Sequence, residues 1–174
     1  IMIELTNLQK VVDQTLALDI NALTVAGGDI VAVVGPVGSG KRVLLDLLIG
    51  RTPPTVGSVS LAGVDPAADK KAFSRSVGVL FAEDSLYKHR SPRGNLDFYR
   101  RLRGLPKRQV PEVLVDVGLA DRADTRLDKL TSGLRRRLAF ACATLHHPSV
   151  LILAKPFARC DEASIALLTR LIRE

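Results

Sequence analysis

The stretch GPVGSGKR constrains the fold of this chain more than any other feature of its sequence. Its first seven residues, 35–41, fit the pattern GxxxxGK. An apolar run at residues 30–34 precedes it and predicts a strand, and VLLDLLIG follows it and predicts a buried helix that ends at Gly50. A strand, a glycine-rich loop and a helix in this order are the context that a phosphate-binding loop requires. We therefore expect backbone N–H groups, the helix N-terminus and the Lys41 ammonium to bind phosphate oxygens.

The residue after this loop departs from the usual pattern. A working loop continues with Ser or Thr, whose hydroxyl holds Mg²⁺, but position 42 is an arginine. The candidate phosphate-binding residues are Gly35, Pro36, Val37, Gly38, Ser39, Gly40, Lys41 and Arg42. The alternative interpretation of this stretch is a glycine-rich turn without a ligand.

Composition fits one globular domain. The chain has 174 residues, 47% of them apolar and 25% charged. Its apolar runs are far shorter than the roughly 20 residues that cross a bilayer. The first residues lack the apolar core of a secretory signal, and Cys142 and Cys160 are the only cysteines. We expect a cytosolic, reduced protein.

Periodicity predicts alternating strands and helices. The expected strands span residues 2–8, 16–25, 30–34, 58–61, 77–81 and 150–153. The expected amphipathic helices, besides the one after the glycine loop, span residues 95–102, 109–117, 132–146 and 162–173. In the third of these, one apolar stripe is formed by Leu134, Leu138, Ala141 and Leu145.

Positive charge is concentrated in residues 88–108. Eight basic residues against Asp97 give this segment a charge of +7, which equals the net charge of the whole chain. Three interpretations stay open: a solvated basic face, a surface for an acidic partner helix or anionic lipid, and a nucleic-acid surface. Nucleic acid is the least favoured, because no nucleic-acid motif is present and only two aromatic residues lie among the charges.

Several blocks in order resemble an ATP-binding cassette domain, the nucleotide-binding subunit of membrane transporters, of the drug-exporter type. After the phosphate loop come PTVGSVSLAGVDP, then VGVLFAEDSLY, which looks like the family's Q-loop region, and GNLDFYRRLRGLP, which is similar to an exporter motif. LDKLTSGLRRRLAFACATLHHPSVLILAKPFARCD has the layout of a signature motif, a helix, a Walker B strand and a D-loop. The resemblance covers residues 2–173.

The chain departs from this family at the positions that perform chemistry. Val12 replaces the aromatic residue that stacks on adenine, and Ala82 replaces the Q-loop glutamine. Only the leucine and second glycine of LSGGQ are kept in LTSGL. Ala154 and Lys155 replace the metal-binding aspartate and the general-base glutamate. The family's switch histidine would lie beyond the last helix, after Glu174. With these departures, the resemblance implies no catalytic residue and no metal ligand in this chain.

The resemblance implies an α/β P-loop nucleoside-triphosphatase fold of the ATP-binding cassette type, C-terminally short. It has a parallel core sheet, N-terminal antiparallel strands and a helical subdomain. Residues 1–174 would form one domain, with a core subdomain at residues 1–81 and 148–174 and a helical subdomain at residues 82–147.

The resemblance and the departures together predict a degenerate cassette with little or no ATP hydrolysis. It would act as a non-hydrolysing or regulatory partner of an exporter-type permease. ATP or another phosphate-containing anion is the expected ligand, without Mg²⁺. The permease would contact residues 88–108 at the inner face of a membrane, and a competent second cassette is a further candidate partner. The alternatives are a phosphate-binding scaffold module unrelated to transport and an active ATPase with relocated groups.

Four other features have ordinary structural interpretations. Ser132 is expected to cap the helix that follows it, and the three arginines at residues 135–137 to form a solvated helix face. Asp46 is expected to be a structural partner rather than a metal ligand. Cys142 is expected in the core, whereas Cys160 lies in a loop.

Overall fold

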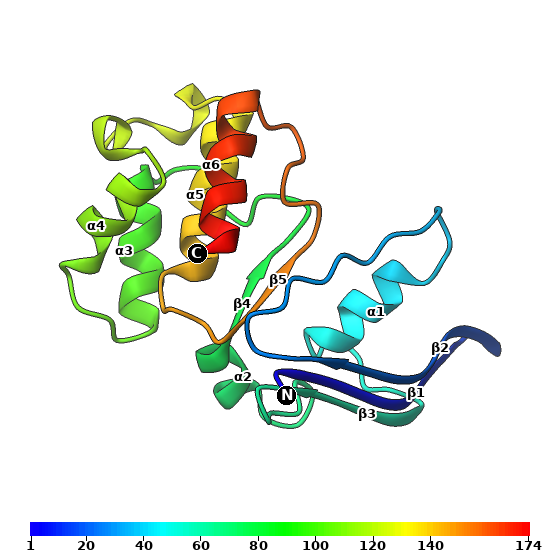
Figure 1. The fold of residues 1–174 in the computed structure, drawn as a ribbon. Helices are drawn as coiled ribbons and strands as arrows, with labels where there is room; N and C mark the ends of the chain where they lie inside the picture. Colours follow the sequence, from blue (N-terminus) through cyan, green and yellow to red (C-terminus); the bar gives the residue numbers. More distant parts are fainter. The chain divides into compact units, whose positions relative to one another are not determined.

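A computed structural model describes all residues 1–174, which separate into two compact units, Ile1–Val77 and Gly78–Glu174 (Figure 1). The first unit contains β1 (Ile3–Val12), β2 (Thr15–Val25), α1 (Lys41–Leu48), β3 (Val56–Leu61) and α2 (Lys70–Ser76). The second contains α3 (Pro92–Leu102), α4 (Gln109–Asp116), α5 (Ser132–Thr144), β5 (Val150–Leu153) and α6 (Glu162–Arg173). The strand β4 (Val77–Leu80) begins at the boundary, and two short 3₁₀ helices, Ala120–Arg122 and Leu127–Lys129, follow α4.

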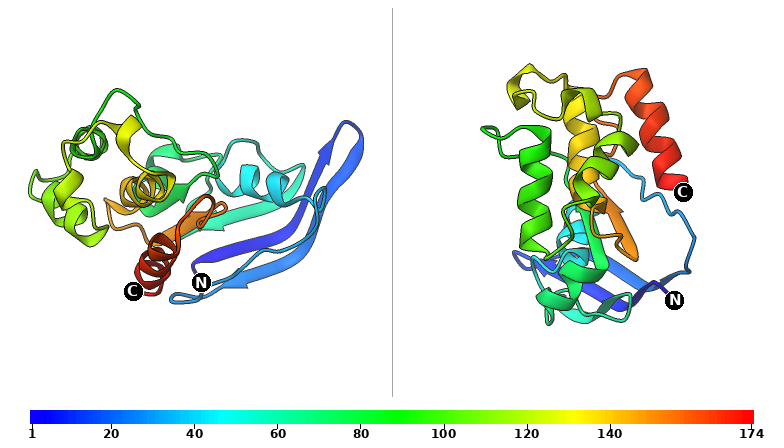
Figure 2. Two further views of the ribbon diagram at one scale, coloured as in Figure 1. Left: turned by 90° about the horizontal axis from the view of Figure 1, so that it is seen from above. Right: turned by 90° about the vertical axis from the view of Figure 1, so that its left-hand side faces the viewer.

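The first unit is built on an antiparallel sheet in the order β2-β1-β3. Figure 2 shows its β1–β2 hairpin as a long two-stranded ribbon. The hairpin turns at Asp13 and Gln14, whose φ angles of 48° and 62° are both positive, as a two-residue type I′ connection requires. The buried side chains of this unit include Leu5, Leu8, Val25, Leu44, Leu47, Val59 and Leu61. Two of them, Leu44 and Leu47, belong to α1, which contacts β2 and β3.

The expected strand at residues 30–34 is not present in the structure. These residues have irregular backbone, and Ile30, Val31, Val33 and Val34 are exposed, Val34 to 87%. A strand exists only where a neighbour pairs with its backbone, and within the first unit the three strands pair only with one another. The apolar run alone could not supply this partner, so the prediction was wrong.

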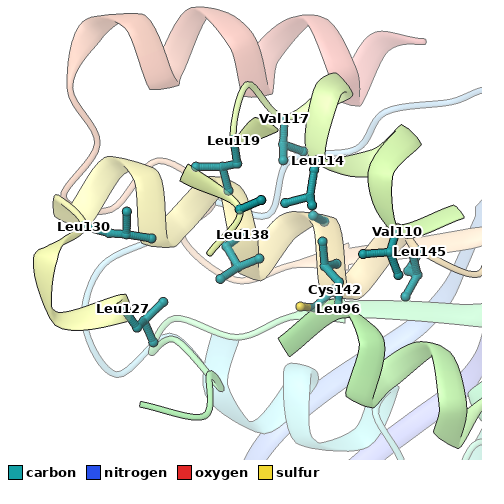
Figure 3. Close-up of a cluster of buried hydrophobic side chains, with 12 residues drawn as sticks. Leu96, Val110, Leu114, Val117, Leu119, Leu127, Leu130, Leu138, Cys142 and Leu145 are labelled. Atoms are coloured by element: carbon teal, nitrogen blue, oxygen red, sulfur yellow. The ribbon is translucent and has the colours of Figure 1, made fainter. Parts of the chain in front are cut away.

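The second unit surrounds α5 with helices, and its largest cluster of buried apolar side chains is drawn in Figure 3. The predicted stripe on α5 is confirmed, since Leu138, Ala141 and Leu145 lie in this cluster and Leu134 packs against it. The cluster also takes Leu96 from α3 and Leu114 from α4. A second cluster contains Leu80, Ala139, Phe140, Ala143 and Leu168. One helix thus serves two cores, because apolar residues cover most of its circumference.

The remaining elements agree with the expected ones to within a few residues. β5 and α6 have the predicted bounds, α4 ends one residue earlier, and α3 begins at Pro92 because Ser91 accepts a hydrogen bond from the Gly94 N–H and caps it. The helix α2 was not expected, although Asp69 caps its N-terminus by accepting from Ala72 N. β4 and β5 form a two-stranded parallel sheet. The structure contains no helix long and apolar enough to cross a membrane.

Candidate phosphate-binding loop

The glycine loop leads directly into α1, as the sequence predicts. Gly40 is the N-cap of α1 and has a φ of 82°, in the left-handed region of backbone angles that residues with a side chain rarely adopt. A Cβ at this residue would lie 2.9 Å from the carbonyl oxygen of Ala17. Both the backbone angle and this close approach therefore require glycine, and together they set where the helix begins.

Lys41 folds its side chain back over the loop. Its Nζ donates hydrogen bonds to the carbonyl oxygens of Gly35 and Pro36, both at 2.6 Å, and to Ser39 Oγ at 3.1 Å. The Ser39 N–H donates to the Pro36 carbonyl at 3.3 Å and closes a turn. The ammonium thus lies among the residues expected to bind phosphate. An anion bound here would replace the Gly35 and Pro36 carbonyl oxygens as the acceptors of the Lys41 hydrogen bonds.

Arg42 points along α1 instead of toward the loop. Its Nε lies 3.2 Å from Asp46 Oδ2, while its side chain is 74% exposed. Arg51 forms a second ion pair with Asp46 at 2.7 Å. The structural role expected for Asp46 is confirmed, because two arginines occupy its carboxylate.

In the second unit, β5 ends at residues that offer no carboxylate. Ala154 and Lys155 follow the strand, and the Lys155 side chain is exposed, with a backbone φ of 50°. The Ala154 N–H donates to the Leu80 carbonyl at 2.8 Å and continues the link between β5 and β4. Across the whole chain, no group of three or more His, Cys, Asp and Glu side chains is placed to hold a metal ion.

The solvated face expected for residues 135–137 is wrong for two of the three arginines. Arg136 is only 1% exposed, and its guanidinium donates to the Ala154 and Lys155 carbonyls at 2.8 and 2.7 Å. Arg137 Nε donates to the buried Ser164 Oγ at 2.7 Å. These side chains turn inward because the carbonyl and hydroxyl oxygens around α5 need donors.

The helix α5 is capped one residue earlier than expected. Thr131, not Ser132, is its N-cap, and the Thr131 Oγ accepts from the Leu134 N–H at 3.3 Å. Ser132 is the first helical residue, and its Oγ donates to the Arg159 carbonyl at 2.7 Å. Either hydroxyl suits an N-cap, so the sequence could not choose between neighbours.

The surroundings of one carboxyl and of both thiols shift the pKa values of these groups. Hydrogen bonds from Ser164 hold the pKa of the Asp161 carboxyl below its usual value, with the Arg137 charge acting in the same direction. Burial raises the pKa of both thiols, Cys142 and Cys160. Cys142 belongs to the main core cluster, as expected. A raised thiol pKa means less thiolate at neutral pH, so both cysteines are poor nucleophiles.

The basic segment at residues 88–108 is partly neutralised within the second unit. Arg93 pairs with Asp124 at 2.9 Å, and Asp97 pairs with Arg100 at 2.7 Å and with Arg101 at 2.8 Å. Arg100 is buried. Asp97 is already included in the segment's charge of +7, so Asp124, which lies outside the segment, is the partner that lowers this charge further.

An aromatic cluster is formed by Tyr87, just before this segment, and by Phe98 and Tyr99 within it. The ring centroids of Tyr87 and Phe98 are 4.5 Å apart, and those of Phe98 and Tyr99 are 5.4 Å apart. The Arg90 guanidinium lies 5.3 Å from the Phe98 ring and 5.7 Å from the Tyr87 ring, so it makes cation–π contacts with both. Tyr87 is 45% exposed, and its ring and the exposed Arg90 guanidinium form an aromatic and cationic surface just before the N-terminus of α3.

Comparison with known proteins identifies the family. The family profile described as ABC transporter matches residues 18–158, and the chain belongs to this family. The spermidine/putrescine import ATP-binding protein PotA of Lawsonia intracellularis is 33% identical over 92% of this chain and 44% of its own length. The Nod factor export ATP-binding protein I of Sinorhizobium fredii is 32% identical over 92% of this chain and 48% of its own length. Relatives thus include importers and exporters, so the comparison supports the cassette family but not the exporter subtype.

Solved structures agree with the predicted fold. An ATP-binding subunit of an ABC transporter superposes with a TM-score of 0.89 at 22% identity, over 99% of this chain and 74% of that one. An ATP-binding cassette dimer bound to ADP and Pi gives a TM-score of 0.81 at 23% identity, over 98% of this chain and 81% of that one. The ATP-binding cassette fold is confirmed. The chain spans about half the length of the curated relatives it matches.

Proposed function

We propose that this chain is a degenerate ATP-binding cassette that binds a phosphate-bearing ligand without hydrolysing it. It would act as a non-hydrolysing or regulatory partner of an exporter-type membrane permease. The observation that carries the proposal is a contrast between two segments. Residues 35–41 keep a glycine loop with an inward-facing lysine at the start of α1, whereas Ala154 and Lys155 after β5 supply neither a metal-binding carboxylate nor a general base.

The residues at the expected metal positions do not fit Mg²⁺. This ion prefers oxygen ligands, especially carboxylates and hydroxyls. Position 42 carries a guanidinium that is already paired with Asp46, and position 154 carries a methyl group. We infer that the ammonium of Lys41 and the loop N–H groups bind the anion, with Arg42 as a further cation if it leaves Asp46.

The first prediction is that the purified chain hydrolyses ATP no faster than its Lys41→Ala variant. Loss of a general base alone lowers a rate by about 10²- to 10⁴-fold, and loss of the metal removes charge stabilisation as well. Phosphate release by both proteins measures this. Turnover at the rate of an ordinary cassette, abolished by Lys41→Ala, would favour an active ATPase with relocated groups.

The second prediction is that ATP and pyrophosphate bind equally well in EDTA and in excess Mg²⁺. Titration calorimetry measures both affinities, and Lys41→Ala should weaken them at least about tenfold by removing a charge-assisted contact. Lys10→Ala is the matched control, because it removes an ammonium that bonds to Thr52 and not to the glycine loop. It should leave the affinities for ATP and pyrophosphate unchanged. Binding that requires Mg²⁺ contradicts the metal-free site. No binding in either condition favours a scaffold in which the loop only joins two segments.

The permease contact is proposed at residues 88–108. Its support is the exposed aromatic and cationic surface that Tyr87 and Arg90 form at the start of this segment, which suits an acidic partner helix. We further infer a core subdomain at residues 1–81 and 148–174, a helical subdomain at residues 82–147, and pairing with a competent second cassette. This arrangement would hold the chain at the inner face of a membrane.

A further inference from the structure

Arg136 is a buried cation that neither the family resemblance nor the proposed function uses. It lies on α5 and ranks first by volume among the side chains that are almost fully buried. A buried charge is costly unless hydrogen bonds and an opposite charge compensate for it. The surroundings of its guanidinium therefore decide what the residue does.

All five N–H groups of this guanidinium find acceptors, and the acceptors come from two separate segments. In the turn after β5, Nε donates to the Pro156 carbonyl at 3.0 Å, and Nη2 donates to the Ala154 and Lys155 carbonyls at 2.8 and 2.7 Å. In the segment after β4, Nη1 donates to the Phe81 carbonyl at 2.6 Å and to Asp84 Oδ1 at 3.4 Å. The two segments are about 70 residues apart in sequence, and this side chain bonds to both of them beyond the last β4–β5 hydrogen bond, from the Ala154 N–H to the Leu80 carbonyl.

The turn after β5 is shaped to receive a cation. Lys155 has a φ of 50°, and three consecutive carbonyl oxygens, from residues 154–156, face the same guanidinium. A non-glycine residue in this region of backbone angles is sterically strained, and this conformation persists only when the surrounding contacts hold it. Arg136 supplies those contacts through fixed, planar donors that a lysine could not reproduce.

We propose that Arg136 locks residues 81–84 and residues 154–156 into one unit that opens only as a whole. Breaking the guanidinium away from either segment leaves a buried charge short of acceptors, so the two segments are held or released together. In the resemblance, these segments carry the Q-loop position and the two Walker B carboxylate positions. The lock goes beyond the proposed function because it needs no nucleotide, and it makes Arg136 a positioning residue rather than a catalytic one.

Backbone amide exchange measured by NMR tests this lock. The amide of Tyr87, which lies just after the first segment and donates to Asn95 Oδ1 at 2.8 Å, reports on opening of the chain at that end. The amide of Ala158, which donates to the Lys155 carbonyl at 3.0 Å, reports on the second. In Arg136→Gln both should exchange about ten- to a hundredfold faster. The Leu119 amide, bonded to the Leu114 carbonyl at 2.7 Å, should change much less.

Arg135→Gln is the matched control. Arg135 is the neighbouring residue and donates to the Leu130 carbonyl at 2.8 Å, without contact to either locked segment. It should leave the Tyr87 and Ala158 amides unchanged. Faster exchange at only one segment in Arg136→Gln, or an equal rise at Leu119, would overturn the proposal in favour of a local or a general structural role.

Wild-type protein provides a second test if Arg136→Gln does not fold. In low concentrations of urea, the Tyr87 and Ala158 amides should show the same opening free energy and the same dependence on urea. Two different dependences would mean that the segments open separately, and the lock would be refuted. The same measurement can be made with pyrophosphate present, which should leave the ratio of the Tyr87 and Ala158 exchange rates unchanged.

Discussion

At the scale of single residues, position 57 requires glycine because of both its backbone angle and its neighbours. It lies in β3 with a φ of 81°, and a Cβ there would meet the carbonyl oxygens of Thr6 and Asn7. Asn7 itself has a φ of 45°, at the point where the register between β1 and β3 shifts. This irregularity bends the sheet, and no side chain fits on its β3 side.

We expect Gly57→Ala to destabilise the chain by about 3 kcal/mol, from the left-handed angle and the overlap together. Gly63→Ala is the control, since Gly63 has a φ of 77° with no atom within 4 Å of a built Cβ. It should lose about 1 kcal/mol from the angle alone. Urea denaturation followed by far-UV circular dichroism measures both. Equal losses would show that the contact with β1 does not matter.

Arg136 shows what sequence cannot provide at this scale. An arginine between two other arginines on a helix is ordinarily solvated, and nothing in the local sequence distinguishes it from Arg135. Its burial follows from carbonyl oxygens contributed by residues before and after it in the chain. By contrast, the Gly40 helix start follows from the local GxxxxGK pattern, so this part of the candidate site could be predicted.

At the scale of elements, the N-terminus of α6 depends on a charged cap. Asp161 Oδ1 accepts from the Ser164 N–H at 2.7 Å, and this bond and that from the Ser164 side chain lower the carboxyl pKa. A carboxyl with a lower pKa in the folded state stabilises the fold when ionised. Its contribution is complete above the unfolded pKa of about 4 and is lost as the pH falls through the folded value.

We therefore expect Asp161→Asn to have a lower thermal midpoint than the wild-type protein at pH 7. The difference between the two midpoints should narrow as the pH falls below about 4. Asparagine still accepts the capping hydrogen bond, so the comparison isolates the charge. Other carboxyls with lowered pKa values, including those of Asp97 and Asp124, titrate in both proteins and cancel in the difference. A gap that stays constant from pH 7 to pH 2 would contradict the assignment.

The elements that sequence predicted well are those with a complete local signal. β5 and α6 have the predicted bounds, since one is a short apolar run and the other an amphipathic helix with a capping aspartate. The expected strand at residues 30–34 failed because strand formation depends on a pairing partner that an apolar run does not specify. The short helix α2 was missed, although Asp69 was a usable capping signal.

At the scale of the whole molecule, the chain consists of two compact units, each with buried apolar side chains of its own. Units of this kind need not unfold together, in which case different probes give different transitions. We expect the urea transition seen by tyrosine fluorescence to differ from that seen by far-UV circular dichroism, which reports on both units. Superimposable curves would show that the chain unfolds as one cooperative body.

The aromatic cluster at α3 gives this protein a natural optical label. The chain has no tryptophan, and its two tyrosines, Tyr87 and Tyr99, lie 6.3 Å apart between ring centroids, in the second unit. Tyrosine emission therefore reports on the second unit, and the first unit, where the glycine loop lies, has no tyrosine. A Phe73→Trp substitution on α2 would place a second fluorophore in the first unit. Ligand binding at the loop and partner binding at the basic segment could then be followed at two wavelengths in one cuvette.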